Sequence, residues 1–478
     1  MSTTTHDEQA TLARPAPPAP TAATGPEGLA HLRAAVRGPV LLPGEPGYAE
    51  EVATFNLAVT HRPDVVVGAT SADDVAAAVA WAAARDLPVA VHATGHGPIR
   101  PVEGALLVTT ARLAAVRVDP AARTAHVSGG ARWADVLAAA EPHGLTAVTG
   151  SSSSVGVVGF CLGGGMGPLS RRYGFGADLV RSLDVVTADG RIRHVDAAHE
   201  PDLFWALRGG KGNFGVVTAL EVELVPVPTL HAGALVFAGE GAAGVLHSFR
   251  TWSATLPDHA SASVALVNLP PAETVPEPLR GRYVVMLRFA VDGSDEESAE
   301  LLAPMREAGD VLLDGVSRIP SSMVDLIHQD PTDPMPTWEK GGLLGELPAP
   351  AVDALLEVAG PGRCPELAMV ELRLMGGALG RPAAVPNSVA GREGAYSLFT
   401  LGVLAPPVAA LVPAAGQRVH DALSPWSTGT ALVNFLGGET TPEQLVRAWA
   451  PEPRERLLRV KRRVDPANLF RFGHALCG

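Results

Sequence analysis

Hydrophobic and polar positions along the first half of the chain predict short strands interleaved with helices. The β-branched run 64–68 and the apolar run 88–92 are typical of two strands. Between them, Ser71 and the two aspartates near it indicate a helix N-terminus, and an Ala-rich amphipathic segment continues to Arg85. Further strands are predicted at 106–109, 124–128, 183–187 and 216–224, and a further helix at 133–140. The last two strands resemble antiparallel partners, so the predicted class is α+β and not a regular βαβ alternation.

From Pro226 to about Leu432 the pattern changes to long strand-like runs that alternate with helical ones. Strands are predicted at 283–290, 367–374 and 395–404, and helices at 242–254, 294–308 and 348–358. This arrangement indicates a separate sheet that helices cover on one face. The tail from Pro442 to Val464 is predicted to be helical, and the Asp465-Pro466 pair ends it.

The length of 478 residues exceeds what one hydrophobic core usually supports, so two packed domains are expected. A formal charge of -13 repels phosphate backbones and anionic membranes, which argues against nucleic acid or a membrane as partner. The basic run 459–463 is interpreted as a solvated helix face.

The three cysteines, Cys161, Cys364 and Cys477, are too few and too scattered for a disulfide framework, and they lack the spacing of zinc ligands. No metal site is therefore expected. Residues 1–25 contain no apolar leader segment and are expected to be disordered. Together with the lack of a long apolar stretch, these features predict a cytoplasmic protein.

Small residues and one imidazole follow directly after the strand at 88–92. Glycine and other small residues let backbone N–H groups approach a phosphate closely, and the turn leaves the imidazole of His96 poised for chemistry. A single histidine after a strand is more often structural, and that interpretation stays open from spacing alone. The residues of this candidate site are Ala93, Thr94, Gly95, His96 and Gly97.

The most glycine-dense segment of the chain runs from Gly150 to Gly167. Its serines and glycines offer O–H and N–H donors that suit a pyrophosphate, and we expect them not to pack a core. A flexible linker is the alternative, but apolar residues interleave with the glycines and the segment lies inside a domain. The candidate cofactor-binding residues here are Gly150, Ser151, Ser152, Ser153, Gly156, Gly159, Leu162, Gly163 and Gly164.

Five motifs in this order resemble the berberine bridge enzyme-like family of FAD-linked oxidases. They are the Thr-Gly-His-Gly turn at 94–97, the glycine run 155–167, Ser-Arg-Arg-Tyr-Gly at 170–174, Gly-Asn-Phe-Gly-Val-Val at 212–217, and the terminal run 460–470. The match spans about 50–225 and 430–475, and 374–378 with 389–392 resembles further family motifs more thinly.

The resemblance implies a PCMH-type FAD-binding domain and a substrate domain with an antiparallel sheet covered by helices. The implied boundaries are a disordered tail at 1–25, the FAD-binding domain at 26–226, the substrate domain at 227–432, and a C-terminal segment at 433–478 that completes the FAD-binding domain. FAD is the implied cofactor, attached covalently to His96. Many family members add a cysteine tether where this chain has Ser152, so a single bond is expected. Val217 and Asn434 are also implied to contact the flavin.

The chain departs from the family at the positions that remove a proton from the substrate. Met166 and Leu432 stand where family sugar and alcohol oxidases have tyrosines. The remaining candidates are Tyr396, Glu371 and Arg373, each as plausibly structural as catalytic. An apolar pocket around Glu371 would raise its pKa into a useful range.

The leading hypothesis is an oxidase that transfers hydride from a small organic molecule to the flavin and electrons to O₂. The substrate is expected to be a secondary-metabolite intermediate, apolar or polyketide-like more than a sugar, and the protein a monomer or homodimer. The alternatives are a redox-neutral cyclase or eliminase, which the missing tyrosines favour, and a flavin-storage module without catalysis. Only an oxidase bleaches its flavin on anaerobic mixing with substrate.

Overall fold

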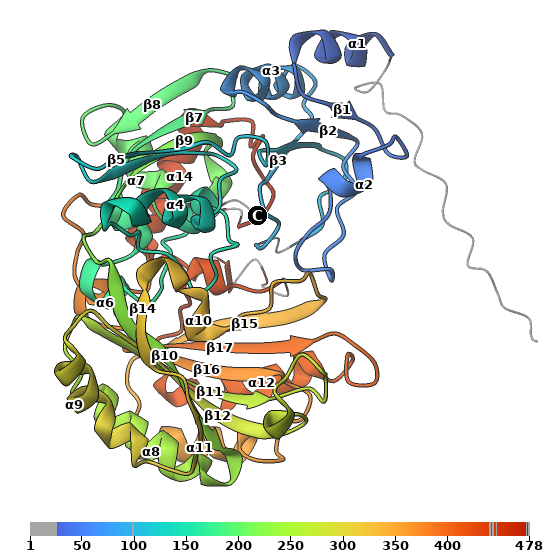
Figure 1. The fold of residues 1–478 in the computed structure, drawn as a ribbon. Coiled ribbons are helices and arrows are strands. Elements are labelled where there is room, and N and C mark those ends of the chain that lie inside the picture. Colours follow the sequence, from blue (N-terminus) through green and yellow to red (C-terminus); the bar gives the residue numbers. More distant parts are fainter. Residues whose placement is uncertain are drawn as a thin grey trace, which may run out of the picture.

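A computed structural model of the protein describes residues 26–97, 100–438, 441, 444–445, 447–474 and 476. The tail 1–25 and Cys477 lie outside the described residues. Figure 1 shows two parts: an upper one built from the first half of the sequence and the C-terminal residues, and a lower one built from the middle of the chain.

A four-stranded sheet at the N-terminal end has the order β1-β2-β4-β3. Its strands are β1 (Val40–Leu41), β2 (Val65–Gly68), β3 (Val89–His92) and β4 (Leu106–Thr109), and its helices are α1 (Pro26–Ala35), α2 (Tyr48–Glu51) and α3 (Ala72–Ala83). The strands β2, β4 and β3 pair in parallel. The Ser71 hydroxyl accepts a hydrogen bond from the Asp74 N–H at 3.1 Å, which confirms the predicted helix start.

A five-stranded antiparallel sheet follows in the order β5-β6-β9-β7-β8. Its strands are β5 (Val116–Asp119), β6 (Thr124–Ser128), β7 (Val180–Val186), β8 (Ile192–Asp196) and β9 (Val216–Glu223). The helices of this region are α4 (Trp133–Ala140), α5 (Val157–Leu162), α6 (Ser170–Tyr173) and α7 (Pro201–Leu207). Side chains of α3 pack with Val186 and Val216 in one buried cluster, so the two sheets share a core.

The middle of the chain forms an eight-stranded antiparallel sheet in the order β13-β10-β12-β11-β16-β17-β15, with β14 paired to β10. Its strands are β10 (Thr229–Ala238), β11 (Ala260–Asn268), β12 (Tyr283–Val291), β13 (Val311–Asp314), β14 (Ser317–Pro320), β15 (Thr337–Leu344), β16 (Met369–Leu374) and β17 (Tyr396–Val403). The helices are α8 (Ala242–Ser253), α9 (Asp295–Arg306), α10 (Asp325–His328), α11 (Ala349–Ala359) and α12 (Val412–Ala422).

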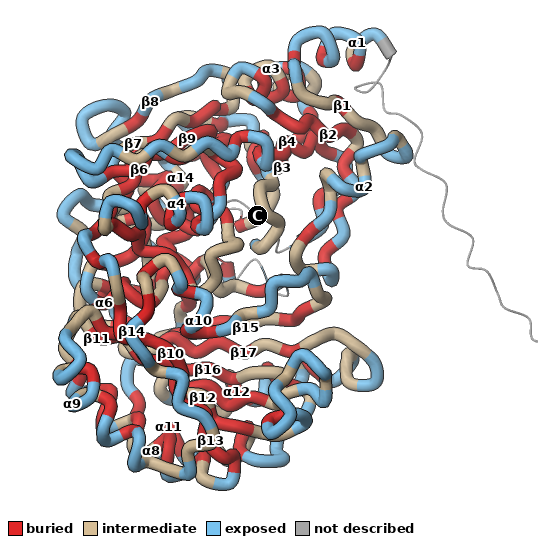
Figure 2. Tube along the Cα trace, in the orientation of Figure 1, coloured by how far each residue is buried: buried red, intermediate tan, exposed pale blue. Residues whose placement is uncertain are grey.

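This large sheet has two different faces, as the alternation of side chains along a strand requires. Helices α8, α11 and α12 cover the face that is turned away from the rest of the molecule (Figure 1). That face contributes the largest hydrophobic cluster, and Figure 2 shows the buried interior between sheet and helices. The predicted sheet covered by helices on one face is confirmed. The opposite face is turned toward the N-terminal half.

The C-terminal residues return to the N-terminal half through α14 (Pro451–Val464). The N–H of Val89 in β3 donates to the Leu469 carbonyl at 2.9 Å. The buried Lys461 ammonium donates to the Asp465 carboxylate at 2.5 Å and to the Asn213 and Phe470 carbonyls at 2.8 Å each. The prediction of a fully solvated basic face is therefore wrong for Lys461. The prediction of one continuous helix from Pro442 to Val464 is wrong, because Gln444 and Leu445 are helical but 447–449 form a turn and a bend, and α14 begins only at Pro451. Residues 442, 443 and 446 lie outside the described residues.

Two negative findings apply to the described part of the chain. None of its helices is long and apolar enough to cross a membrane. It also contains no group of three or more His, Cys, Asp or Glu side chains that could hold a metal ion.

Candidate active site

The turn after β3 presents His96 between the two halves of the molecule. Gly95 adopts φ +73°, and a Cβ there would lie 2.9 Å from the Phe55 nitrogen, so only glycine fits without a shift. The Phe55 N–H donates to the Gly95 carbonyl at 3.0 Å, which fixes the segment around Phe55 against the turn.

The imidazole of His96 is held on three sides. Its Nδ1 lies 2.9 Å from the Thr94 hydroxyl, and its Nε2 lies 3.3 Å from the Ser154 hydroxyl. The ring of Phe55 stacks on it with centroids 4.2 Å apart and planes inclined by 16°. Burial, with a smaller contribution from Arg132, lowers the pKa of His96 to about 4. The ring is therefore neutral near pH 7 and keeps a lone pair on one nitrogen.

The glycine-dense segment is not the loop that the sequence suggested. Residues 157–162 form helix α5, and Val157, Phe160 and Leu162 belong to a buried cluster. The expectation that this segment does not pack a core is wrong, because the apolar side chains of the helix are buried and only Gly159 is exposed. The glycines Gly164 and Gly165 after the helix take φ +100° and +81°, which permits the turn there.

The serines of the segment divide into two groups. Ser152 and Ser154 share a hydrogen bond of 2.8 Å, and Ser154 reaches His96 as described above. Ser153 instead donates through its N–H at 2.7 Å and its hydroxyl at 2.5 Å to Asp325 of α10. Ser153 thus joins the two halves of the molecule, and Ser151 beside it is half-buried.

Two observations test whether this region fits an FAD. The Asn434 carboxamide donates to the Phe160 carbonyl at 2.9 Å, but its buried Oδ1 has no hydrogen-bond partner among the described residues. A Cβ added to Gly97 or Gly159 would meet no protein atom within 4 Å. The isoalloxazine ring of FAD is a large ligand with an N–H donor. It fits a site that offers an unpaired acceptor and two glycines that face open space.

The remaining predicted cofactor residues differ in what they contact. Gly163 is closed off, because a Cβ there would lie 2.0 Å from Asn434 Oδ1. The Gly156 N–H donates to the Thr94 hydroxyl at 3.3 Å and links the two glycine-containing segments. Gly150 contacts the Phe160 ring, and the side chain of Val217 lies in the core cluster with Leu162.

Cys161 shares the segment with Ser152 but points the other way. Its side chain is buried in the same core cluster, and burial raises the pKa of its thiol to about 12. A protonated and inaccessible thiol does not form a covalent bond to a ligand in the open space.

The predicted catalytic residues lie on opposite faces of the eight-stranded sheet. Tyr396 packs against α8 on the helix-covered face, where its hydroxyl lies 2.9 Å from the Ser253 hydroxyl. Glu371 and Arg373 lie on the other face, and Arg373 Nε donates to the Glu371 carboxylate at 2.7 Å. The structure therefore brings Glu371 and Arg373 together and keeps Tyr396 away from them.

The expected rise in the pKa of Glu371 is also wrong in direction. Burial alone would raise this pKa, but the positive charges of Arg373 and Arg288 outweigh burial and hold the pKa well below its usual range. Both carboxylate oxygens are occupied by donors: Ser263 and Arg288 on one, Arg373 on the other. An ionised carboxylate in this state is a poor acceptor for a further proton.

Met166 and Leu432 pack together with Leu343 and Met375 in a small buried cluster. The structure thus places apolar side chains at both positions where family members have tyrosines.

Glu339 of β15 is a site residue that sequence reasoning missed. On this strand Leu343 faces Met166 and Leu432, and Gly341 faces Phe435, so Glu339 shares the face turned to the N-terminal half. Burial raises the pKa of Glu339, and a hydrogen bond of 2.8 Å from the Thr337 hydroxyl partly opposes this rise. The Asn56 carboxamide in turn bonds both the N–H and the carbonyl of Thr337 at 3.0 Å.

The alternation of side chains along a strand could have identified Glu339, because positions 339, 341 and 343 lie on the same face. The strand was not predicted, however, because Gly341 and Gly342 interrupt it. Phe55 lies far from His96 in sequence, and no spacing rule connects them.

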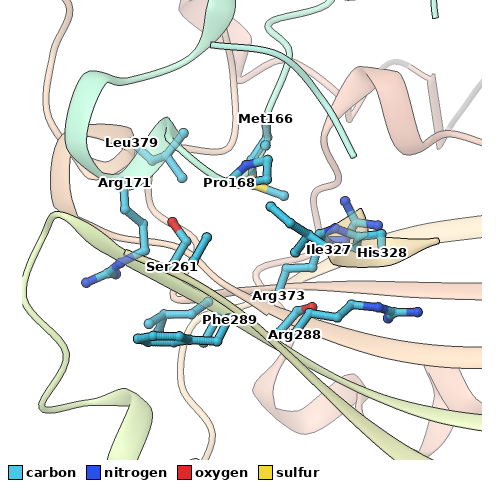
Figure 3. A pocket seen from close by; sticks show the side chains of 15 residues that line it. Met166, Pro168, Arg171, Ser261, Arg288, Phe289, Ile327, His328, Arg373 and Leu379 are labelled. Atoms are coloured by element: carbon cyan, nitrogen blue, oxygen red, sulfur yellow. The ribbon is translucent and has the colours of Figure 1, made fainter. Parts of the chain in front are cut away.

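A cavity of about 40 Å³ lies between the end of the glycine segment and the large sheet (Figure 3). Met166, Gly167 and Pro168 line it on one side, and residues of β11, β12, β16 and α10 line the other. Figure 3 shows Arg288, Arg373 and His328 at one end of the cavity and Arg171 at the other.

Comparisons with known proteins show a likeness to FAD-linked oxidases. A family model described as an FAD binding domain matches residues 63–196. The (R)-6-hydroxynicotine oxidase of Paenarthrobacter nicotinovorans is 28% identical over 464 residues, which cover 92% of this chain and 96% of that protein. An FAD-dependent monooxygenase of Fusarium proliferatum is 39% identical over 166 residues, or 34% of this chain and 32% of that one.

Solved structures extend the likeness to both halves of the molecule. The crystal structure of 6-hydroxy-D-nicotine oxidase from Arthrobacter nicotinovorans has a TM-score of 0.79 at 25% identity and covers 92% of this chain and 97% of its own. A chitooligosaccharide oxidase has a TM-score of 0.81 at 19% identity and covers 94% and 99%. The second comparison supports the fold alone.

Proposed function

Since the chain belongs to the berberine bridge enzyme-like family of FAD-linked oxidases, we propose that it oxidises a small organic molecule at a flavin bound covalently to His96. The observation that carries this proposal is the state of His96: a neutral imidazole, fixed by Phe55, Thr94 and Ser154, beside open space. When bound, FAD would accept a hydride from the substrate and pass the electron pair to O₂, which gives hydrogen peroxide.

Residues of the N-terminal half would hold the cofactor. The open space at Gly97 and Gly159 gives it room, and Asn434 Oδ1 offers an acceptor to an N–H group. Ser152 stands where a second tether would be, and Cys161 is turned into the core, so we propose a single covalent bond. We also propose that 26–226 and 433–478 form the FAD-binding domain and 227–432 the substrate domain.

Glu339 is our candidate for the group that accepts a proton from the substrate. It combines a raised pKa with a position on the sheet face that is turned toward the N-terminal half, and the contact between Asn56 and Thr337 fixes the strand beside it. A carboxylate with a raised pKa is a better base near neutrality than one in its ordinary range. In this proposal Arg373 positions the substrate, Glu371 holds the Arg373 side chain in place, and Tyr396 supports the sheet.

The test is anaerobic mixing of the purified holoenzyme with candidate substrates, followed by admission of O₂. We expect loss of the flavin absorption and then its recovery with one peroxide per substrate. Conversion of a substrate to product without loss of absorption would contradict oxidation and support the redox-neutral cyclase or eliminase instead.

A further inference from the structure

The wall of the cavity in Figure 3 carries an excess of positive charge. Three arginines, Arg171, Arg288 and Arg373, line it together with His328, and no acidic side chain is among its lining residues. Arg171 is fully engaged at its own end, because its guanidinium donates to the carbonyls of Ala260 at 2.7 Å and Leu256 at 3.1 Å. The unengaged donors therefore lie at the opposite end.

At that end two guanidinium groups share a single carboxylate. Glu371, which is fully buried, accepts from Arg288 Nη1 at 2.8 Å and from Arg373 Nε at 2.7 Å. One negative charge between two positive ones leaves a net positive charge among side chains that are at most 11% exposed. Such a charge is costly unless an anion compensates it.

Polar atoms at this end also lack partners. Arg288 is 5% exposed, yet its Nε has no hydrogen-bond partner among the described residues, and its Nη2 has only the weak contact to the Met369 sulfur at 3.7 Å. His328 is 8% exposed and its Nδ1 is likewise unpaired in the described part of the chain. Buried polar groups without partners are rare in native proteins, and a ligand that forms hydrogen bonds at this end of the cavity would satisfy both of them.

We propose that this cavity binds a carboxylate group, so that the substrate is a small organic acid whose carboxylate lies against Arg288, Arg373 and His328. This inference rests on the proposed function. The volume of about 40 Å³ has room for about three water molecules, or for one carboxylate in their place. Planar guanidinium groups match the two oxygens of a carboxylate, and such charge-assisted hydrogen bonds are stronger than neutral ones.

The experiment titrates the holoenzyme with benzoate, benzamide and phenyl phosphate at constant ionic strength and follows heat by calorimetry. Benzoate and benzamide have nearly the same shape, so the pair isolates the charge. We expect benzoate to bind at least about tenfold more tightly than benzamide. Equal affinities would overturn the proposal, and tighter binding of phenyl phosphate than of benzoate would overturn the assignment to a carboxylate.

Variants that remove a positive or a negative charge should change the affinity for benzoate in opposite directions. Arg288→Met should weaken benzoate binding by about tenfold or more, with Arg288→Lys between it and the wild type. Glu371→Gln removes the competing negative charge and should strengthen benzoate binding. A loss of structure cannot strengthen binding, so Glu371→Gln decides the matter even where Arg288→Met fails to fold. Unchanged benzoate affinity in folded Arg288→Met, or weaker binding in Glu371→Gln, would contradict the site.

These measurements involve no turnover, so the two proposals fail separately. A holoenzyme that binds benzoate but oxidises no candidate acid would retain the anion site and lose the proposed oxidase function. Oxidation of neutral molecules without benzoate binding would retain the proposed oxidase function and overturn the anion site.

Discussion

The ring of Phe55 lies parallel to the imidazole of His96, with centroids 4.2 Å apart. This contact removes one face of the imidazole from water and contributes to the burial that keeps it neutral. A protonated imidazole has no free lone pair, so the same contact favours formation of a bond from His96 to a flavin.

Replacement of His96 by alanine should remove the covalent bond and leave the fold. We expect the wild-type protein to stay yellow after acid precipitation and the variant to give a colourless pellet. The flavin of the variant should also be reduced more slowly, because the electron-withdrawing bond is lost. His92→Gln is the matched control, since it changes the other imidazole of the same strand and turn. A colourless wild-type pellet would contradict the covalent bond.

Phe55→Leu should give a protein in which only part of the flavin is covalently bound. Leucine keeps the apolar character but not the flat stacked contact, so His96 becomes more exposed and more readily protonated. The ratio of flavin to protein absorbance after denaturation measures the covalent fraction. A fraction equal to that of the wild type would show that Thr94 and Ser154 are sufficient to position His96.

Gly159→Ala should separate protein stability from cofactor binding. Nothing in the protein lies within 4 Å of a Cβ at this position, and alanine is favoured over glycine inside a helix by about 1 kcal/mol. The apoprotein should therefore be as stable as the wild type or slightly more so, while its flavin content falls. Gly241→Ala, which also faces open space but lies at the start of α8, should keep its full flavin content. Normal flavin content in Gly159→Ala would place the cofactor elsewhere.

Glu339→Gln should lower turnover by about 10²-fold or more at unchanged flavin content, the usual scale for loss of a general base. In the wild type, activity should fall with decreasing pH at a value above the ordinary range of a glutamate, because the base must be deprotonated and its pKa is raised.

Tyr396→Phe is the control for this prediction. It should keep turnover and cost about 1 kcal/mol of stability through loss of the hydrogen bond to Ser253. The reverse outcome, with an active Glu339→Gln and an inactive Tyr396→Phe, would restore Tyr396 as the proton acceptor.

Stability should fall as the pH decreases from about 6.5 to 4. Burial lowers the pKa of His61 and of His420 to about 4 in the folded protein, whereas an unfolded histidine titrates near 6.5. Between these values the unfolded chain binds more protons, so stability that is present above pH 6.5 is lost toward pH 4. Thermal unfolding at a series of pH values measures this loss.

A double variant provides the control for the pH series. His61→Asn keeps an acceptor for the Val102 N–H, and His420→Gln keeps a partner for the Thr400 hydroxyl. The variant should lose less stability than the wild type over the same pH range. An equal loss would assign the effect to other groups.

The sequence predicted the elements whose signals are local. The helix at 133–140 and the strand at 124–128 were confirmed to the residue, because each has a regular apolar pattern and Gly129 and Gly130 separate them. Strand β15 was missed since its two glycines weaken the pattern. The buried state of Lys461 was missed as well, because its partners Asn213 and Phe470 come from other segments.

Only the parts of the candidate site that lie within sequence motifs were predictable. The turn at His96 and the glycine segment were located, although helix α5 was not foreseen. The electrostatics of Glu371 depend on Arg288, which is 83 positions away on β12 and is separated from β16 by β11, so the direction of the pKa shift of Glu371 could not be read from a local pattern. Likewise, Tyr396 and Glu371 are assigned to opposite faces only once the register of β16 and β17 is known.

The contacts of the C-terminal residues have a consequence for how the enzyme is made. The N–H of Val89 donates to the carbonyl of Leu469, and the carboxamide of Asn213 donates to the carbonyl of His474. Both acceptors are among the last residues to be synthesised. While the ribosome is still translating the middle of the chain, the N-terminal half lacks these partners. We therefore predict that the proposed flavin attachment at His96 follows synthesis of the C-terminal residues, and that a nascent chain that stalls before them remains colourless.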